Sequence, residues 1–175
     1  MIYLPMEKLS IRKIIQSDNS AVSQIIRQVM TEFGAVGTGF SIQDPEVDCM
    51  FESHQSPVAS FYVLESKQAL LGCGGISPLV GGDETTCELK KMYFLPQARG
   101  RGAGRVLAEL LVNDARRLGF QRVYIETLES MIAANQLYRK LGFRLLPSKL
   151  GNTGHCGCDT FYELPLQPHE EITIL

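Results

Sequence analysis

The sequence lacks an excess of basic residues, a long hydrophobic run and a paired set of cysteines. Lys and Arg number 17 against 19 Asp and Glu, for a formal net charge of -2, whereas nonspecific binding of nucleic acid usually needs a basic face. No apolar run approaches the ~20 residues that a bilayer span requires. The five cysteines are odd in number and scattered, which is typical of reduced thiols in a cytosolic protein. These absences favour a protein that binds neither nucleic acid nor membrane.

The opening stretch MIYLPMEKLSIRK also lacks the basic segment, apolar segment and cleavage site of a signal peptide. We therefore expect a cytoplasmic location. The sequence contains no internal repeat, low-complexity tract or linker, and 175 residues can bury one hydrophobic core. We expect a single domain over residues 1–175, with its core at about 9–166.

Hydrophobic periodicity predicts alternating strands and helices along the chain. Strands are expected at about 9–15, 60–65, 70–77, 86–95, 122–128, 143–146 and 160–164. Helices are expected from about 18 or 20 to 33, and at about 45–53, 102–118 and 133–141, with Asp18 or Ser20 as the first N-cap. Short hairpin connections coexist with helical crossovers, which indicates an α/β fold with a mixed sheet.

The stretch QARGRGAG, residues 97–104, lies between a predicted strand and a predicted helix. Exposed N–H groups at a helix N-terminus, together with glycines that let a ligand approach the backbone, favour phosphate binding. Arg99, Arg101 and Arg105 could add charge-assisted hydrogen bonds. The glycine spacing fits neither the P-loop nor the dinucleotide-binding motif, so the phosphate belongs to another type of ligand.

The pattern Q-x-x-G-x-G-A in this stretch resembles the pyrophosphate loop of the Gcn5-related N-acetyltransferases (GNAT). The resemblance covers about residues 86–143, with ELKKMYFLP before the loop and VLAELLVNDARRLGF after it, and it extends to AANQLYRKLGF. It implies acetyl-CoA as cosubstrate. It also implies a mixed, mostly antiparallel central sheet that is splayed in the middle and flanked by helices.

The resemblance assigns cofactor contacts to several positions. Pantetheine is expected along the exposed backbone of Met92, Tyr93 and Phe94, and near Ala134. The amides from Arg99 to Arg105 would hold the pyrophosphate; these residues are Arg99, Gly100, Arg101, Gly102, Ala103, Gly104 and Arg105. Tyr138 matches the tyrosine that protonates the departing CoA thiolate, or it could only pack against the sulfur.

A catalytic base is expected because an amine must be neutral to attack, while a lysine-like amine with a pKa of ~10.4 is mostly charged at pH 7. Glu88 is the leading candidate, on the strand that leads to the glycine loop. Glu126, on the next strand, is the alternative. Either carboxylate could instead be a structural partner of Lys90, Lys91 or Arg122, and a water relay to the base is also open.

One position departs from the family pattern. Many relatives carry an asparagine seven residues before the tyrosine, where this chain has Met131. Asn135, one helical turn later, could reach the same face, or the backbone near Ala133 and Ala134 could supply the contact. We therefore do not assign the asparagine role to Asn135.

His155, Cys156 and Cys158 lack the paired spacing of a zinc site, so we expect no metal. The segment GNTGHCGCD is expected to form a turn-rich loop near the acceptor pocket. Another segment, residues 31–54, carries Glu32, Asp44, Glu46 and Asp48. These acids could attract a cationic acceptor or could face solvent.

The predicted function is transfer of an acetyl group from acetyl-CoA to a primary amine of a small molecule or peptide by direct attack. The alternative is a non-catalytic CoA-binding or regulatory module, in which Tyr138 and Glu88 only pack or pair. A small RNA-binding domain is disfavoured by the net charge and by the lack of aromatic residues interleaved with the arginines. Family members are often dimers, so a homodimer is open, and the acceptor amine cannot be read from the sequence.

Overall fold

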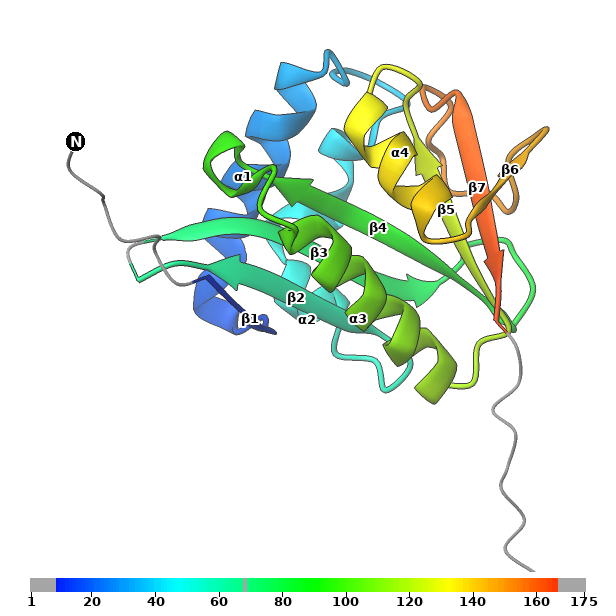
Figure 1. Ribbon diagram of the computed structural model, residues 1–175, viewed down its shortest axis with the longest axis horizontal. Helices are drawn as coiled ribbons and strands as arrows, with labels where there is room; N and C mark the ends of the chain where they lie inside the picture. The colour runs from blue at the N-terminus through cyan, green and yellow to red at the C-terminus, as the bar shows by residue number, and fades with distance from the viewer. Residues whose placement is uncertain (1–8, 68, 167–175) are drawn as a thin grey trace, which may run out of the picture.

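The computed structural model describes residues 9–67 and 69–166. Its strands are β1 (Ser10–Lys13), β2 (Ser60–Glu65), β3 (Leu70–Pro78), β4 (Thr86–Phe94), β5 (Arg122–Thr127), β6 (Arg144–Leu146) and β7 (Thr160–Pro165). They form one seven-stranded sheet in the order β1-β2-β3-β4-β5-β7-β6 (Figure 1). Only the β4–β5 pair among them is parallel. The expectation of a mixed, mostly antiparallel sheet is confirmed.

The longer helices cover both faces of the sheet. They are α1 (Asn19–Glu32), α3 (Ala103–Arg117) and α4 (Ile132–Lys140), and one further turn is α2 (Met50–Ser53). In Figure 1, α3 and α4 lie in front of the sheet, and α1 and α2 lie behind it. Each face has its own apolar core: Leu107 and Leu111 of α3 pack on one side, and Val22 and Ile26 of α1 pack on the other. Among the described residues, no helix is long and apolar enough to cross a membrane.

One predicted detail of the helices is wrong, and another is confirmed in position only. The helix expected at 45–53 is divided, because Cys49 leaves the helical region with φ -138° and ψ 47°. A 3₁₀ turn, Pro45–Asp48, precedes this break and α2 follows it. Asp18 occupies the N-cap of α1 but its side chain caps no helical N–H. Its two oxygens instead accept hydrogen bonds from the guanidinium of Arg12 at 2.7 and 3.0 Å, and Oδ2 also accepts from the N–H of Ile15 at 2.9 Å. A bidentate pair with a guanidinium adds a second charge-assisted bond that a single cap bond lacks.

The sheet splits between its two central strands. Pairing of β4 with β5 runs from Thr86–Arg122 to Glu88–Tyr124, and β4 continues unpaired on that side to Phe94. Figure 1 shows the two strands close together at their starts and diverging towards their ends. The predicted splay is therefore confirmed, and it leaves backbone groups at the end of β4 without a partner strand on the side of β5.

An irregularity in β4 lies within this opened region. The β3–β4 register shifts between Cys73 and Gly75, which is typical of a β-bulge. Lys91, at the bulge, has φ 54°, and no other non-glycine residue in the described part of the chain has a positive φ. The bulge turns the Lys91 side chain into the interior, where it is buried.

Candidate active site

The glycine loop ends in the left-handed backbone region before α3. Gly100 has φ 71° and Gly102, the N-cap residue of α3, has φ 79°. A Cβ at either position would meet no atom within 4 Å, so these glycines are required by backbone conformation and not by crowding. The amides of Gly100, Gly102, Ala103 and Gly104 have no acceptor among the described residues. A row of unpaired N–H groups at a helix N-terminus is suited to bind an anion.

A cavity of about 340 Å³ adjoins this loop. Its lining includes most of the residues predicted to contact the cofactor: Met92, Tyr93, Phe94, Arg99, Gly100, Gly102, Ala103, Gly104, Arg105 and Ala134. Arg101 is not part of this lining, and Tyr138 lies in a second cavity. Val29 of α1, Phe33 directly after α1, and Leu137 of α4 also line the first cavity. Their helical apolar pattern indicated core packing and gave no sign of a role beside a ligand.

Two of the loop arginines are engaged within the protein. Arg99 donates to the carbonyl of Phe94 at 2.8 Å, and its guanidinium pairs with Glu32. Arg105 pairs with Glu109 one helical turn away at 2.8 Å. The main-chain amides are therefore the more direct anion donors of the loop, and the arginines could contribute after exchanging partners.

The second cavity, of about 60 Å³, meets the first one at the residues that line both: Met92, Tyr93, Met131 and Ala134. Tyr138 lies in its wall, 4% exposed, with ring centroids of Phe143 and Tyr162 each 5.8 Å from its own. The Tyr138 hydroxyl has no hydrogen-bond partner within the described part of the chain. Burial raises the pKa of Tyr138 above its ordinary value, so the hydroxyl stays protonated at neutral pH.

Glu88 and Glu126 both line the second cavity, but different contacts hold their carboxylates. Glu126 accepts hydrogen bonds from the hydroxyls of Tyr124 and Thr153, each at 2.9 Å. Glu88 is 4% exposed, and its oxygens have no hydrogen-bond or ion-pair partner among the residues that the structure describes. Burial raises the pKa of Glu88, and the nearby Glu126 adds to the shift. A buried carboxylate with unoccupied oxygens and a raised pKa is a better proton acceptor than an exposed one.

The chain matches one family over most of its length. Residues 24–143 match the acetyltransferase (GNAT) family. The chain belongs to the GNAT family. The uncharacterized N-acetyltransferase YjgM of Escherichia coli strain K12 is 39% identical over 149 residues, which are 85% of this chain and 89% of YjgM.

Solved structures have the same fold as this acetyltransferase. YncA of Salmonella typhimurium, an acetyltransferase structure with its cofactor acetyl-CoA, superimposes with a TM-score of 0.74 at 23% identity, over 93% of this chain and 96% of its own. A GNAT acetyltransferase of Staphylococcus aureus Mu50 gives a TM-score of 0.76 at 19% identity, over 91% and 100%. This GNAT protein is an acyl-CoA-dependent acetyltransferase, and acetyl-CoA is its cosubstrate.

His155 connects distant parts of this acetyltransferase. Its Nε2 lies 2.9 Å from Oδ2 of Asp44, 111 residues away, and its Nδ1 lies 3.4 Å from Oε2 of Glu126. Asp44 also forms an ion pair with the buried Lys91. Burial alone would lower the pKa of His155, but hydrogen bonds to Asp44 and Glu126 outweigh it and raise the pKa to about 9. His155 is therefore a cation at neutral pH, and sequence spacing gave no signal of this connection.

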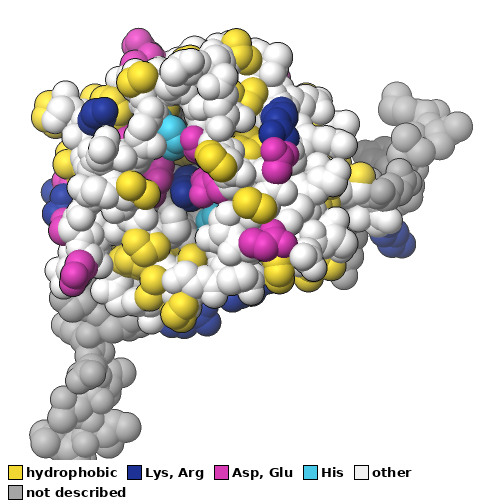
Figure 2. Space-filling model, turned by 180° about the vertical axis from the view of Figure 1, so that it is seen from behind, with side chains coloured by type: hydrophobic (Ala, Val, Ile, Leu, Met, Phe, Trp, Pro, Cys, Tyr) yellow, Lys and Arg dark blue, Asp and Glu magenta, His cyan; other side chains and the backbone are white. Residues whose placement is uncertain are grey.

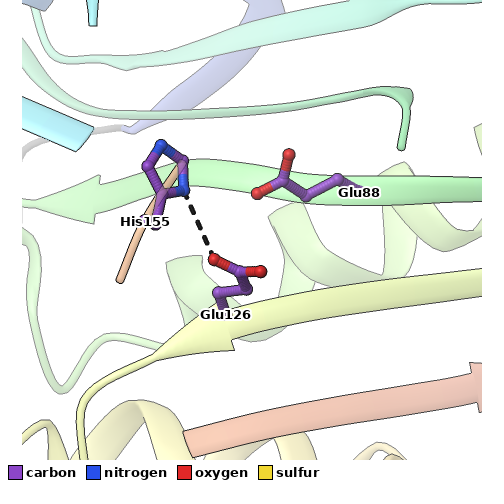
Figure 3. A group of neighbouring side chains, drawn as sticks. All are labelled: Glu88, Glu126 and His155. Carbon is purple, nitrogen blue, oxygen red and sulfur yellow. Dashed lines mark ion pairs between the residues drawn. The ribbon is translucent and has the colours of Figure 1, made fainter. Parts of the chain in front are cut away.

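Glu88, Glu126 and His155 come together from β4, β5 and the loop before β7 (Figure 3). One ligand atom from each lies within 4.8 Å of the others, so the three groups have the composition of a divalent-cation site. A protonated imidazole has no lone pair to offer a metal, and both ring nitrogens of His155 already face carboxylates. The arrangement is better suited to hold a charged imidazole between acids than to bind a metal ion.

Asn135 of the GNAT protein is used within the fold. Its amide nitrogen donates to the carbonyls of Leu128 and Met131 at 2.8 and 2.9 Å, and its oxygen accepts from the hydroxyl of Tyr162 at 2.9 Å. These contacts fix the connection between β5 and α4. Met131, by contrast, lines both cavities, so Asn135 does not occupy the position that is asparagine in many relatives.

Proposed function

We propose that this acetyltransferase moves the acetyl group directly from acetyl-CoA to a primary amine of a small molecule or peptide, with Glu88 as base and Tyr138 as acid. One observation carries the proposal: a buried carboxylate without a partner and a tyrosine hydroxyl without a partner line the same cavity, where it meets the cavity beside the glycine loop. Base, acid and donor thioester can thus meet at one place.

In the proposed complex, the amides from Arg99 to Arg105 hold the pyrophosphate and the backbone of Met92 to Phe94 contacts pantetheine. The unpaired amides at the start of α3 and the side of β4 left open by the split sheet support this assignment. The acetyl thioester then lies at the junction of the two cavities, near Met92 and Ala134.

The proposed step transfers the acetyl group from sulfur to nitrogen and moves protons at two places, the acceptor amine and the leaving thiolate. The ammonium of the acceptor gives a proton to Glu88, and the neutral nitrogen attacks the thioester carbonyl carbon. The C–N bond forms, the C–S bond breaks, and the leaving thiolate takes the proton of Tyr138. The nitrogen, positively charged after its attack, releases its second proton to solvent as the amide forms, and Glu88 passes its own proton to solvent before the next turnover. A thiol has an ordinary pKa of ~8.5, and Tyr138 regains its proton from solvent after product release.

Glu88 is preferred over Glu126 as the base because of what each carboxylate already binds. A carboxylate that accepts from two hydroxyls and faces an imidazolium is stabilised in its charged form and gains less by taking a proton. We assign Glu88 to the proton transfer. We assign a positioning role to Glu126, which holds His155 and the end of β5 in place.

The test is release of CoA thiol from acetyl-CoA in the presence of a panel of amines, with Glu88→Gln and Glu126→Gln as a matched pair. We expect Glu88→Gln to lower kcat by about 100-fold with little change in acetyl-CoA affinity. Glu126→Gln should mainly lower stability, because its amide nitrogen would face His155. If Glu88→Gln slows transfer to a confirmed acceptor by less than about tenfold, the assignment of Glu88 as the base is wrong.

The same assay separates the enzyme from a non-catalytic CoA-binding module. Both would show a higher melting temperature with CoA, but only the enzyme releases thiol when an amine is added. We also propose that no metal takes part, so dialysis against EDTA should leave kcat unchanged. Loss of activity on dialysis and recovery with Zn²⁺ would instead indicate a metal held by Glu88, Glu126 and His155.

A further inference from the structure

The charged groups around the second cavity are almost completely matched. The carboxylates are Asp44, Glu46, Glu88 and Glu126, and the cations are Lys90, Lys91 and His155. Lys90 Nζ lies 3.1 Å from Oε2 of Glu46. Lys91 pairs with Asp44 and lies 3.3 Å from Oε1 of Glu46. His155 contacts Asp44 at 2.9 Å and Glu126 at 3.4 Å.

This pairing of charges leaves one carboxylate of the cluster without a cation. Each cation of the cluster already has a carboxylate, so none remains to receive a carboxylate of the substrate. Glu88 is the member of the cluster whose carboxylate has no ion-pair or hydrogen-bond partner in the described part of the chain. The cavity can therefore neutralise one additional positive charge and no additional negative charge.

Much of the rest of the cavity wall is apolar, and the hydroxyls of Ser41 and Thr127 in this wall donate to the sulfurs of Met30 and Met131. Met30, Ala35 and Phe40 come from α1 and the segment after it, and Leu128 and Met131 come from the connection between β5 and α4. Figure 2 shows the side of the molecule that carries α1 and α2, where acidic, basic and histidine side chains gather near the middle with hydrophobic side chains around them. An amine whose remainder is apolar would fit both parts of this lining.

We propose that the acceptor is an apolar monoamine with no carboxylate beside its reacting nitrogen and no second ammonium, an inference that rests on the proposed function and narrows it. Its ammonium contacts Glu88, and its hydrocarbon part lies against Met30, Phe40 and Leu128.

The charge pattern disfavours two common classes of amine. An α-amino acid would bring its carboxylate, one carbon away from the amine, next to Glu88 and Glu126 with no available cation. A diamine would bring a second ammonium into a narrow, mostly apolar cavity where the other carboxylates are already paired. In both cases a charge would be desolvated without a partner, and binding sites discriminate strongly against such a group.

The experiment measures kcat/KM for thiol release with two matched sets of amines. The first set is isoamylamine, leucinamide and leucine, which share one branched side chain and differ in the group beside the amine. The second set is pentylamine and 1,5-diaminopentane. We expect isoamylamine and leucinamide to agree within about tenfold, and leucine and the diamine to be at least about 100-fold poorer than their monoamines.

The outcomes distinguish the inference from the proposed function. If leucine or the diamine is acetylated as well as its matched monoamine, transfer to an amine stands and the inference is wrong. If leucinamide is as poor as leucine, size and not charge excludes the amino acid, and the inference is again wrong. If none of the five amines releases thiol, both are overturned for amines of this size.

A variant tests the charge argument directly. Glu46→Gln removes the carboxylate that pairs with Lys90 and leaves that cation available in the cavity wall. We expect the ratio of kcat/KM for leucine to that for isoamylamine to rise by about tenfold in this variant, because a substrate carboxylate gains a partner. Melting curves establish that the variant is folded, and an unchanged ratio in a folded variant would contradict the inference.

Discussion

The carboxylates of Glu88 and Glu126 face each other across the opening between β4 and β5, yet only that of Glu126 is hydrogen-bonded. Glu88 and Tyr124 form the last residue pair of the parallel ladder, so pairing with β5 fixes the backbone position of Glu88. Tyr124 then donates its hydroxyl to Glu126, so the ladder that ends at Glu88 also holds the neighbouring acid in place. Glu88 is left with a raised pKa and with its oxygens available.

The raised pKa of Glu88 predicts the acid side of the pH profile. A base works only when it is ionised, so kcat/KM should rise with pH until Glu88 has lost its proton, at a pH above the ordinary 4.5 of a glutamate. Below that point, log kcat/KM should fall with a slope of about one, an additional bend that the substrate does not produce because it binds as the ammonium. Glu88→Gln should remove this additional bend and Glu126→Gln should keep it, as pH-rate measurements on one confirmed amine would establish.

Tyr138→Phe should slow transfer with little effect on stability. The hydroxyl has no partner in the described part of the chain, so removing it leaves no buried group unsatisfied, and the ring contacts with Phe143 and Tyr162 remain. We expect kcat to fall by about 10²-fold, with the melting temperature nearly unchanged.

Tyr162→Phe provides a matched control for the variant at Tyr138. The Tyr162 hydroxyl donates to Oδ1 of Asn135 at 2.9 Å in a buried position, so its loss should cost about 1 kcal/mol of stability. It should affect kcat much less than Tyr138→Phe does. Equal kcat values for Tyr138→Phe and the unmodified enzyme would contradict a role of Tyr138 as acid.

Much of the fold could be predicted from the sequence because local patterns determine it. A short run of β-forming residues before a hairpin-sized connection predicted β2 at 60–65, and the 3.6-residue period predicted the buried face of α1, which includes Val22 and Ile26. Cys49 interrupts the predicted second helix, and no proline or glycine marks the break. The side-chain role of Asp18 depends on Arg12, a tertiary partner that no local pattern indicates.

The site was only partly predictable from the sequence, because several of its contacts join residues that are distant in the chain. The glycine loop is a contiguous motif, and the structure places it between a strand and a helix as the sequence predicted. The pairing of His155 with Asp44 joins residues far apart in the chain, and the bulge that buries Lys91 leaves no residue pattern in β4. The sequence placed Glu88 ahead of Glu126 by its position on the strand before the loop, but the physical reason for that order lies in the hydrogen-bond partners of each carboxylate, which are tertiary contacts.

His155→Gln should reduce stability most at moderately low pH. The pKa of His155 is raised from 6.5 to about 9, so the folded state holds its proton more tightly than the unfolded state does. This contribution is fully present below pH 6.5 and is lost as the pH rises through 9. The difference in unfolding free energy between the unmodified protein and the variant should therefore shrink by on the order of 1 kcal/mol between pH 6 and pH 10, as denaturant titrations would measure.

His54→Gln is the control for the comparison between pH 6 and pH 10. Burial lowers the pKa of His54 to about 4, so its imidazole is neutral at both pH values. The unfolded state, with the ordinary pKa of 6.5, still binds a proton at pH 6, so the stability difference for His54→Gln should grow by about 1 kcal/mol or less from pH 6 to pH 10, opposite in direction to that for His155→Gln. A pH-independent difference for His155→Gln would mean that His155 is not held as a cation by Asp44 and Glu126.

Gly102→Ala should weaken acetyl-CoA binding beyond its effect on stability, and Gly119→Ala should not. Both glycines have positive φ, 79° and 88°, and a Cβ on either would meet no atom within 4 Å. The strain of a left-handed alanine, about 1–2 kcal/mol, should therefore lower the stability of both variants similarly. Only Gly102 lies at the N-terminus of α3, where relief of that strain would turn the unpaired amides away from a phosphate; Gly119 follows the other end of the helix. Calorimetric titration should give an acetyl-CoA Kd at least about tenfold higher for Gly102→Ala and unchanged for Gly119→Ala, and equal values for the two would place the pyrophosphate away from this loop.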